Sequence, residues 1–364
     1  MNLFTLEKLL SNSGHNDFVS LTSAKALLCY LQKPSQAAEV DLILLDIMMP
    51  EMDGIEACKS IRADEQFKNI QIIFVTALED KKRLAEALDI GGNDYISKPL
   101  HKTELLARIR AALRLKKELD WHTEYDRQIQ QELTLAAKVQ QNLLSEPFQN
   151  DQLRIAVSYQ PSAKLAGDLY YWYKIDAHRY GVLLIDMMGH GISASLVCMY
   201  MSSVLRDAIK TMIEPEMVMQ ELNRHMLLLP TNNEDIPFYF TGIYLLIDTD
   251  QKTVEYINAG HPTCYISIDD KTTIPLQSNA TAVGFFDHLH CQKTSFNYDH
   301  SLQIVLFTDG VIEALHTNEF VAERKLQLLA SKHWHFSNHI FDEILPKHKQ
   351  SQQSDDMCVI LIQL

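Results

Sequence analysis

Residues 181–196, GVLLIDMMGHGISASL, are the stretch around which the rest of the chain is organised. An apolar run typical of a strand ends at Asp186, and a loop with two glycines then leads into a segment of helical period. A carboxylate at a strand end can offer its side chain and a nearby carbonyl oxygen to one cation. A lone aspartate before such a loop is more often a turn or cap residue. The choice between these roles depends on the other carboxylates of the chain.

A second carboxylate is expected to lie directly beside Asp186. The sequence from Pro161 to Asp186 has the pattern of a β-hairpin with a polar turn near Ala177, and Asp168 and Asp186 are equally distant from that turn. Antiparallel pairing would therefore make the two carboxylates cross-strand neighbours. Like charges in that position repel each other unless a cation lies between them.

Two later segments also place carboxylates at strand ends. Asp309 follows an apolar strand, whereas Asp355 and Asp356 precede the last strand of the chain. If this last strand is antiparallel to the others, all these carboxylates converge on one sheet edge. A cluster of anions is very costly without cations, so the sequence predicts divalent metal ions bound by oxygen.

Six ordered motifs now carry a resemblance to a known family. They are GDLYYW (167–172), DMMGHGISASL (186–196), NAGHP (258–262), AVGFF (282–286), FTDGVIEA (307–314) and DDMCVIL (355–361). In this order they resemble the metal-dependent protein phosphatases (phosphatase 2C-like), especially the bacterial branch that dephosphorylates antagonists of anti-sigma factors. The resemblance extends from about Leu153 to Leu364 and implies an αββα sandwich with two Mn²⁺ or Mg²⁺ ions at one edge.

The resemblance also implies a ligand set and a reaction. The implied metal ligands are Asp168, Asp186, the backbone carbonyl of Met187, Asp309 and Asp355. Asp356 is an alternative to Asp355, although Asp355 matches the ligand position of the motif. Two metal ions can activate a water for attack on phosphoserine or phosphothreonine, so that no protein nucleophile is required.

Some motif positions leave a second function open. Ala166, Tyr171 and Cys358 depart from the usual pattern of the family. His190 and His261 are candidate proton donors to the leaving oxygen, or else residues that only pack their loops. The alternative function is therefore a catalytically inactive, phosphatase-like module that binds and sequesters its partner. Retention of the mapped aspartates favours the enzyme.

The first third of the chain alternates strand and helix patterns from Leu3 to about Leu115, which predicts a doubly wound, mostly parallel sheet. The expected strands include FVSLT (18–22), DLILLD (41–46), IQIIFVT (70–76) and DYIS (94–97). The segments DLILLDIMMPEMDG, FVTA and DYISKP resemble the receiver domains of bacterial response regulators. The resemblance implies a phosphoacceptor, Asp46, and a pocket formed by Met48, Thr76, Tyr95 and Lys98.

One receiver feature is missing from the sequence. Receivers begin with a central strand that ends in an acidic pair, and this pair completes their Mg²⁺ site. The present sequence begins after that strand, so Mg²⁺ at the receiver is doubtful. Either the true start lies upstream of this Met, which the other motifs favour, or the domain is degenerate and takes up phosphate poorly.

A helical linker is expected between the domains. The stretch from Thr103 to Glu146 lacks Gly and Pro, which predicts one long helix ending at Pro147. Residues at heptad spacing form a seam that is polar in its middle, which indicates a weak dimeric coiled coil or else a solvated connector. This seam consists of Leu115, Leu119, His122, Asp126, Ile129, Leu133, Ala136, Gln140 and Leu143. The predicted domains are a receiver at 1–116, a linker at 117–147 and a phosphatase domain at 148–364.

Composition limits the other possibilities. A net charge of −14 argues against sequence-independent nucleic-acid binding. The 6 cysteines are scattered singly, and no basic leader or long apolar span is present, so we expect a cytoplasmic protein without a membrane span. The sequence thus predicts a response regulator with a serine/threonine phosphatase output. The expected partners are a histidine kinase, a phosphorylated anti-sigma factor antagonist and a second copy of the chain.

Overall fold

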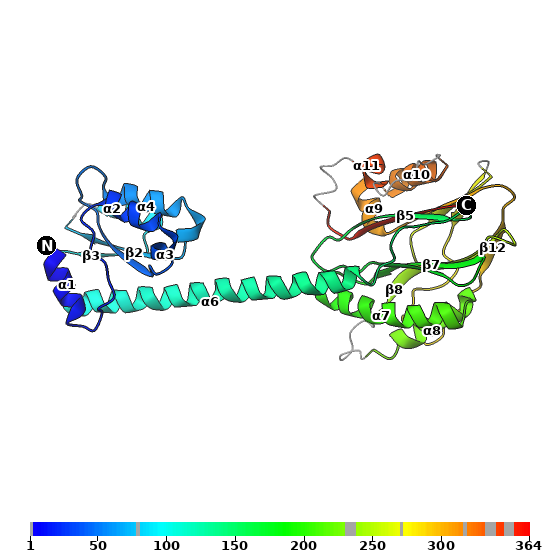
Figure 1. Cartoon of the computed structure of the whole chain (residues 1–364), viewed down its shortest axis with the longest axis horizontal. Helices are drawn as coiled ribbons and strands as arrows, with labels where there is room; N and C mark the ends of the chain where they lie inside the picture. The colour runs from blue at the N-terminus through cyan, green and yellow to red at the C-terminus, as the bar shows by residue number, and fades with distance from the viewer. Residues whose placement is uncertain are drawn as a thin grey trace. The chain divides into compact units, whose positions relative to one another are not determined.

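The computed structural model describes residues 3–77, 81–229, 238–269, 272–315, 319–331, 340–345 and 353–364. Its contacts divide the chain into two compact units, Met1–Gln130 and Gln131–Leu364. The division falls within the long helix α6 (Lys102–Gln141), which Figure 1 shows in full. Since α6 also runs across residue 116, the domain boundaries at 116 and 147 stay a prediction.

The N-terminal unit has a parallel α/β fold. In its described residues, the sheet has three strands in the order β1-β2-β3, each pair parallel. Its elements are α1 (Leu3–Ser11), α2 (Ala24–Leu31), α3 (Pro34–Ala37), β1 (Leu42–Asp46), α4 (Gly54–Arg62), η1 (Glu65–Phe67), β2 (Gln71–Thr76), α5 (Lys81–Asp89), β3 (Asp94–Ser97) and the first part of α6.

Helices cover both faces of this sheet. All six residues of β2 are buried, as expected for a central strand with a core on each side. One core joins α2 and α4 to the sheet around Leu27, Ile55 and Phe74. The other joins α1 and the start of α6 to Ile73 and Ile96. This arrangement agrees with the predicted doubly wound receiver.

The predicted strand at residues 18–22 is wrong. The backbone there is irregular, and Phe18 and Val19 are exposed. In a receiver this strand pairs with the central first strand, which the sequence does not contain. Without that neighbour the segment has no ladder of hydrogen bonds to join, so its apolar composition alone does not make it a strand.

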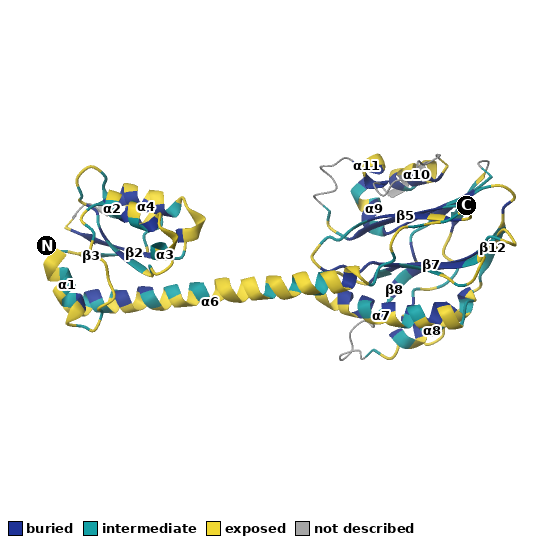
Figure 2. Ribbon diagram, viewed as in Figure 1, coloured by how far each residue is buried: buried dark blue, intermediate teal, exposed yellow. Residues whose placement is uncertain are grey.

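The long helix ends before the predicted position at Pro147. Instead, α6 ends at Gln141 and a turn follows. The segment after this turn contacts β6 (Leu169–Lys174) of the C-terminal unit, because the Ser145 hydroxyl accepts from the Trp172 N–H (3.0 Å) and donates to the Trp172 carbonyl (3.2 Å). The middle of α6 is exposed (Figure 2), including Trp121 and Tyr125, whose rings stack at 5.2 Å.

The C-terminal unit contains two antiparallel sheets in its described residues. One has six strands in the order β11-β10-β13-β14-β5-β4, and the other has five in the order β12-β9-β8-β7-β6. The elements are β4 (Phe148–Gln149), β5 (Arg154–Gln160), β6 (Leu169–Lys174), β7 (Arg179–Met187), α7 (Ile192–Thr211), α8 (Pro215–Met226), β8 (Phe240–Asp248), β9 (Thr253–Ala259), β10 (Cys264–Ile268), β11 (Thr272–Leu276), β12 (Thr294–Asn297), β13 (Leu302–Phe307), α9 (Asp309–Leu315), α10 (Glu319–Ala330), α11 (Ile340–Ile344) and β14 (Met357–Gln363).

These sheets form the predicted αββα sandwich. A large apolar core fills the space between them, where Val182 and Leu245 of one sheet share a cluster with Ile304 and Ile360 of the other. Helices α7 and α8 cover the five-stranded sheet, whereas α9, α10 and α11 cover the six-stranded sheet (Figure 1). Each sheet therefore has one face toward the shared core and one toward helices.

Helix α7 is unusually apolar for a helix on the outside of a sandwich. Within the described residues it is the one helix long and apolar enough to cross a membrane. Half of its most apolar stretch is buried inside the protein, where Met201 and Leu205 pack in the core against the five-stranded sheet. Burial explains the apolar side chains on the inner face of α7, so this helix is weak evidence for a membrane span.

Candidate metal and phosphatase site

The predicted hairpin brings Asp168 and Asp186 together. Strands β6 and β7 are antiparallel with Leu169 opposite Ile185, so the next pair outward is Asp168 and Asp186. Asp168 is only 2% exposed, and among neighbouring charges its carboxylate interacts most strongly with that of Asp186. The turn near Ala177 therefore sets the register that the sequence predicted.

The remaining carboxylates come from the other sheet. Asp309 begins α9 directly after β13, and Asp355 precedes β14, which is antiparallel to β13. The charges of Asp309 and Asp355 both act on Asp186, so the groups do converge. The prediction of one sheet edge is wrong in this detail. The five-stranded and six-stranded sheets each contribute carboxylates, which meet at one end of the sandwich.

The structure separates the roles of Asp355 and Asp356. The Asp356 carboxylate accepts hydrogen bonds from the Ser162 N–H (2.6 Å), the Ser162 hydroxyl (2.9 Å) and the Gly167 N–H (2.7 Å). These bonds occupy both of its oxygens and fix residues 161–168, which we call the metal loop. Asp355 is less buried, and its Oδ1 accepts from the N–H of Asp356 (2.8 Å). The greater exposure of Asp355 and its smaller number of hydrogen bonds favour it as the ligand.

The four carboxylates of this cluster all have raised pKa values. Burial, followed by the charges of Asp309 and Asp355, raises the pKa of Asp186 to about 8. Burial and Asp186 raise the pKa of Asp168 well above its usual range, and burial raises the pKa values of Asp309 and Asp355. Such shifts mean that the ionised carboxylates are unstable here without a cation.

These residues fit divalent metal ions. Among the described residues, the buried Oδ2 of Asp168 has no hydrogen-bond partner. A side chain at Gly167 would lie 3.4 Å from the Met187 carbonyl oxygen, so glycine keeps the space beside that carbonyl open. In the described residues, no three Asp, Glu, His or Cys side chains lie close enough together to hold a metal ion by themselves. Mg²⁺ and similar ions keep several waters and bind through one or two carboxylates.

The two histidines occupy different environments. His190 is exposed in the loop before α7. His261 is buried, its Nε2 donates to the Phe307 carbonyl (3.1 Å), and its Nδ1 accepts from the Thr241 hydroxyl (3.2 Å). Burial lowers the pKa of His261 to about 3, so this imidazole is neutral at pH 7. The geometry favours a packing role for His261 rather than that of a proton donor.

A contact that the sequence did not predict joins the linker helix to the metal loop. The buried Gln140 side chain donates to the Ala166 carbonyl (2.7 Å) and accepts from the Ala166 N–H (3.0 Å). Ala166 is one of the positions that depart from the family pattern. Heptad spacing predicts Gln140 and Leu143 in a seam between two copies, but here both contact other residues of the C-terminal unit. Arg206 of α7 donates to the Leu143 carbonyl (2.9 Å).

The other two departures, Tyr171 and Cys358, pack in different cores of the C-terminal unit. Arg206 also lies over the ring of Tyr171 at 5.3 Å, so an aromatic contact occupies the position where the family often has an aspartate. Cys358 is fully buried, and its N–H donates to the Thr308 hydroxyl (3.0 Å). Burial raises the pKa of the Cys358 thiol well above its usual range, so it is not a reactive thiolate.

The receiver pocket is partly assembled. Lys98 Nζ forms an ion pair with Asp46, and the Met48 N–H donates to the Asp46 carboxylate (3.1 Å). Thr76 is buried at the end of β2, and Tyr95 lies within β3. Asp46, Thr76 and Lys98 thus lie at the C-terminal ends of three parallel strands, as predicted.

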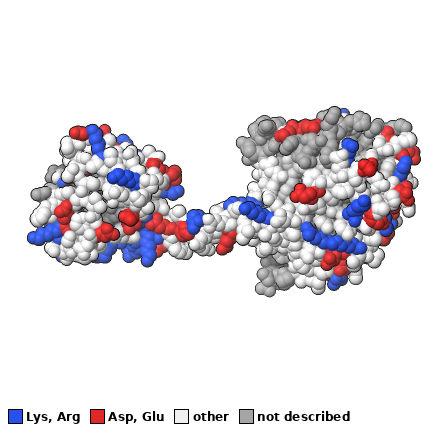
Figure 3. All heavy atoms as spheres, viewed as in Figure 1, with Lys and Arg blue, Asp and Glu red and all other residues white. Residues whose placement is uncertain are grey.

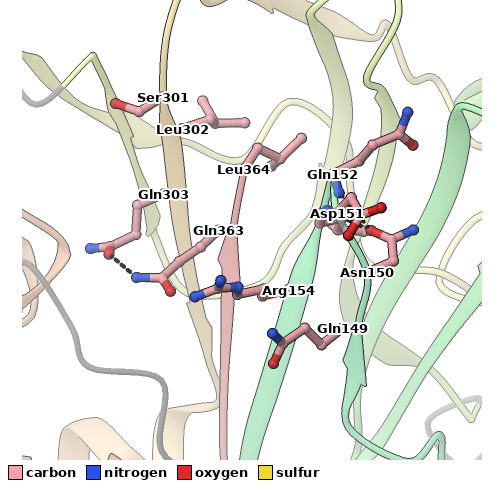
Figure 4. A pocket seen from close by; sticks show the side chains of 11 residues that line it. Gln149, Asn150, Asp151, Gln152, Arg154, Ser301, Leu302, Gln303, Gln363 and Leu364 are labelled. Carbon is pink, nitrogen blue, oxygen red and sulfur yellow. Dashed lines mark hydrogen bonds between the residues drawn. The ribbon is translucent and has the colours of Figure 1, made fainter.

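A separate cavity of about 770 Å³ lies at the opposite end of the six-stranded sheet (Figure 4). It is lined by the start of β13 and the end of β14, including Gln303 and Gln363, whose side chains are hydrogen-bonded at 2.9 Å. Asp309 and Asp355 lie at the other ends of these same strands. The cavity is therefore distinct from the carboxylate site, and its amide-rich lining contains none of the predicted ligands.

The fold and the carboxylate site together define a receiver joined to a phosphatase 2C-like domain. The family model described as Stage II sporulation protein E (SpoIIE) matches residues 176–364, and the response regulator receiver domain model matches residues 1–110. The first match covers more than half of the chain, and this chain belongs to the SpoIIE family.

Individual relatives agree with this assignment. The chain is similar to the phosphoserine phosphatase RsbP of Bacillus subtilis, with 37% identity over 64% of this chain and 57% of RsbP. Phosphoserine phosphatase RsbU of the same organism is 30% identical over 65% of this chain and 70% of RsbU. The SiaA-PP2C domain of Pseudomonas aeruginosa matches the fold with a TM-score of 0.52 at 16% identity, over 66% of this chain and 98% of that domain. The chain thus spans 57% of the length of RsbP.

Proposed function

We propose that the C-terminal unit is a metal-dependent phosphatase that hydrolyses phosphoserine or phosphothreonine in a protein. The observation that carries this proposal is the convergence of Asp168, Asp186, Asp309 and Asp355, whose pKa values are raised by burial and by one another's charges. Phosphatases of this family generally depend on Mn²⁺ or Mg²⁺. The resemblance of the motifs further suggests that the substrate is a phosphorylated anti-sigma factor antagonist.

Each residue of the site has a defined task in this proposal. Asp186, Asp309 and Asp355, with the Met187 carbonyl, would hold the two ions, and Asp168 would bind beside them. When bound, the ions supply a water of lowered pKa and neutralise phosphate charge. Asp356 fixes the metal loop through its three hydrogen bonds. Its role is positional, since both of its oxygens already have partners.

The enzyme is tested by phosphate release from a phosphoserine peptide in Mn²⁺. We expect Asp309→Asn to lower kcat/KM on the order of 10³-fold, because it removes one negative ligand of a shared metal site. Asp207→Asn on α7 is the matched control, since it makes the same charge change at an exposed position. Equal and negligible release from the wild type and Asp309→Asn would instead favour the module that only binds and sequesters its partner.

We infer that the receiver regulates this site through α6. Three hydrogen-bonded contacts join the region after residue 130 to the metal loop and β6: Lys164 Nζ donates to the Thr134 hydroxyl (3.0 Å), Gln140 pairs with Ala166, and Ser145 pairs with Trp172. A change in the pairing or rotation of α6 would therefore reach the loop that holds Asp168. Phosphorylation of Asp46 by a histidine kinase would bias that equilibrium.

Dimerisation is part of this proposal. The exposed middle of α6, around Trp121 and Tyr125, is free to pair with a second copy, whereas the seam residues from Gln140 onward already contact the phosphatase unit. Acidic and basic side chains are interspersed on the face of the protein in Figure 3. We propose a cytoplasmic location on grounds of composition.

Regulation is tested with a phosphate mimic at the receiver. Beryllofluoride with Mg²⁺ is expected to change the phosphatase kcat/KM by about fivefold or more, because typical coupling free energies are about 1–3 kcal/mol. Asp46→Ala should remove this response while retaining basal turnover. A mimic that binds at Asp46 but changes neither turnover nor the sedimentation coefficient would refute the coupling between the receiver and the phosphatase.

A further inference from the structure

Six large apolar side chains beside the carboxylate site remain exposed, and together they form what we call the apolar patch. Its members are Met188, Ile192, Leu196, Tyr200, Phe285 and Phe286, which are between 37% and 61% exposed. Single exposed apolar residues are ordinary, but a group of them near the carboxylate site points to a binding surface.

Helix α7 supplies one half of the patch. Ile192, Leu196 and Tyr200 recur at every fourth residue, so they follow one face of the helix over roughly 12 Å. Residues 189–205 contain no Asp, Glu, Lys or Arg, which leaves this face without acidic or basic side chains along most of its length. An exposed helix face is normally polar, and the absence of charge here is therefore an exception.

The phenylalanine loop (residues 284–286) supplies the other half and is held firmly in place. The buried side chain of Asn223 donates to the Phe286 carbonyl (3.0 Å) and accepts from the Gly284 N–H (2.7 Å). Gly284 has a φ of +92°, and a side chain there would clash with the Phe238 carbonyl oxygen at 2.6 Å. The hydrogen bonds and the glycine conformation of this turn therefore hold Phe285 and Phe286 in exposed positions.

The patch is continuous with the carboxylate site. The N–H of Met188 donates to the Tyr239 carbonyl (3.1 Å), and the Tyr239 ring packs against Phe285 at 5.6 Å. On the other side, a side chain at Gly167 would lie 3.5 Å from the Ala194 side chain, in the first turn of α7. Any molecule that covers the patch therefore lies next to the loop that holds the metal ligands.

We propose that the apolar patch is the docking surface for apolar side chains that flank the phosphoserine of a protein substrate. This inference rests on the proposed phosphatase function and specifies its substrate class. A small phosphoester has nothing to place on the patch, whereas a protein must cover it to bring its phosphate to the site. A second copy of this chain bound here would block that approach, so the substrate is the occupant that the position favours.

Two synthetic phosphoserine peptides of equal length test the proposal in Mn²⁺. One has leucine at alternate positions on both sides of the phosphoserine, because alternate residues of an extended peptide share one face. The other has serine at those positions. We expect the full-length wild type to prefer the leucine peptide by about tenfold in kcat/KM. In Leu196→Glu this ratio should fall to about one.

Leu328→Glu is the matched control, because Leu328 on α10 is 64% exposed and Leu196 is 61% exposed. This control should retain the tenfold preference. A wild type without preference, or a preference that persists in Leu196→Glu, would overturn the proposal. A sedimentation coefficient that changes in Leu196→Glu alone, with the preference retained, would assign the patch to a second copy.

If the wild type hydrolyses neither peptide nor p-nitrophenyl phosphate, the proposed function fails instead. Docking would then be judged by anisotropy of the labelled leucine peptide, which must bind Leu196→Glu more weakly.

Discussion

Asp186→Asn is expected to abolish metal-dependent phosphate release and, at the same time, to stabilise the metal-free protein. Asp186 is the carboxylate on which the charges of Asp309 and Asp355 both act, so the substitution would remove the central ligand of the proposed metal site. We expect kcat/KM to fall on the order of 10³-fold or more. Phosphate release at saturating Mn²⁺ measures the first effect, with Asp207→Asn again as the control.

The stabilising effect of Asp186→Asn has a defined pH dependence. The pKa of Asp186 is about 8 in the folded, metal-free protein, against an ordinary value near 4 in the unfolded chain. The raised folded value means that stability is fully present below about pH 4 and is lost as the pH rises through 8. The variant lacks this titration. Urea unfolding in EDTA should therefore show a difference of a few kcal/mol at pH 8 and a smaller one at pH 5. Equal stability of the two proteins at pH 8 would contradict the buried-charge argument.

Gln140→Ala is expected to have the second large effect. The substitution leaves the N–H and carbonyl of the buried Ala166 without their partner, at a cost of roughly 1–3 kcal/mol for each group. Ala166 lies two residues before Asp168, so the metal loop should lose its fixed position. We expect phosphatase activity to fall about 10- to 100-fold, and the Mn²⁺ concentration for half-maximal activity to rise.

The adjacent residue provides the control for this prediction. Gln141 has the same side chain but is exposed, whereas Gln140 is 5% exposed. Gln141→Ala should therefore leave activity and Mn²⁺ dependence within about twofold, in line with other exposed substitutions. Gln140→Glu should be intermediate, since a carboxylate can accept from the Ala166 N–H but cannot donate to its carbonyl. Equal activities of the Gln140→Ala and Gln141→Ala variants would refute a role for the contact.

Much of this arrangement could be predicted from the sequence, for identifiable physical reasons. Equal spacing from a turn fixes a hairpin register, which is why the pairing of Asp168 with Asp186 is confirmed. Alternating apolar patterns likewise predict β1, β2 and β3 with their functional residues at the strand ends. The assignment of Asp309 and Asp355 to a shared edge with Asp186 is wrong, because periodicity does not tell which of two packed sheets receives a strand.

Other features depend on contacts between distant segments. The apolar run at residues 18–22 has the composition of a strand, but strand formation also requires a neighbour that the sequence does not contain. Gln140 fits a heptad seam equally well, and only the folded chain shows its amide paired with Ala166. Asp356 resembles a competing ligand in the sequence, and only its hydrogen bonds to Ser162 and Gly167 distinguish it from Asp355.

The origin of the carboxylates in two different sheets has a mechanical consequence. Cations bound by Asp186 of one sheet and Asp309 of the other would hold the two sheets together at one end of the sandwich. Chelation should then open that end locally, and protease cleavage or hydrogen exchange would appear first in the turns around these residues. Metal binding would therefore determine the local stability of this end of the domain as well as its catalytic activity.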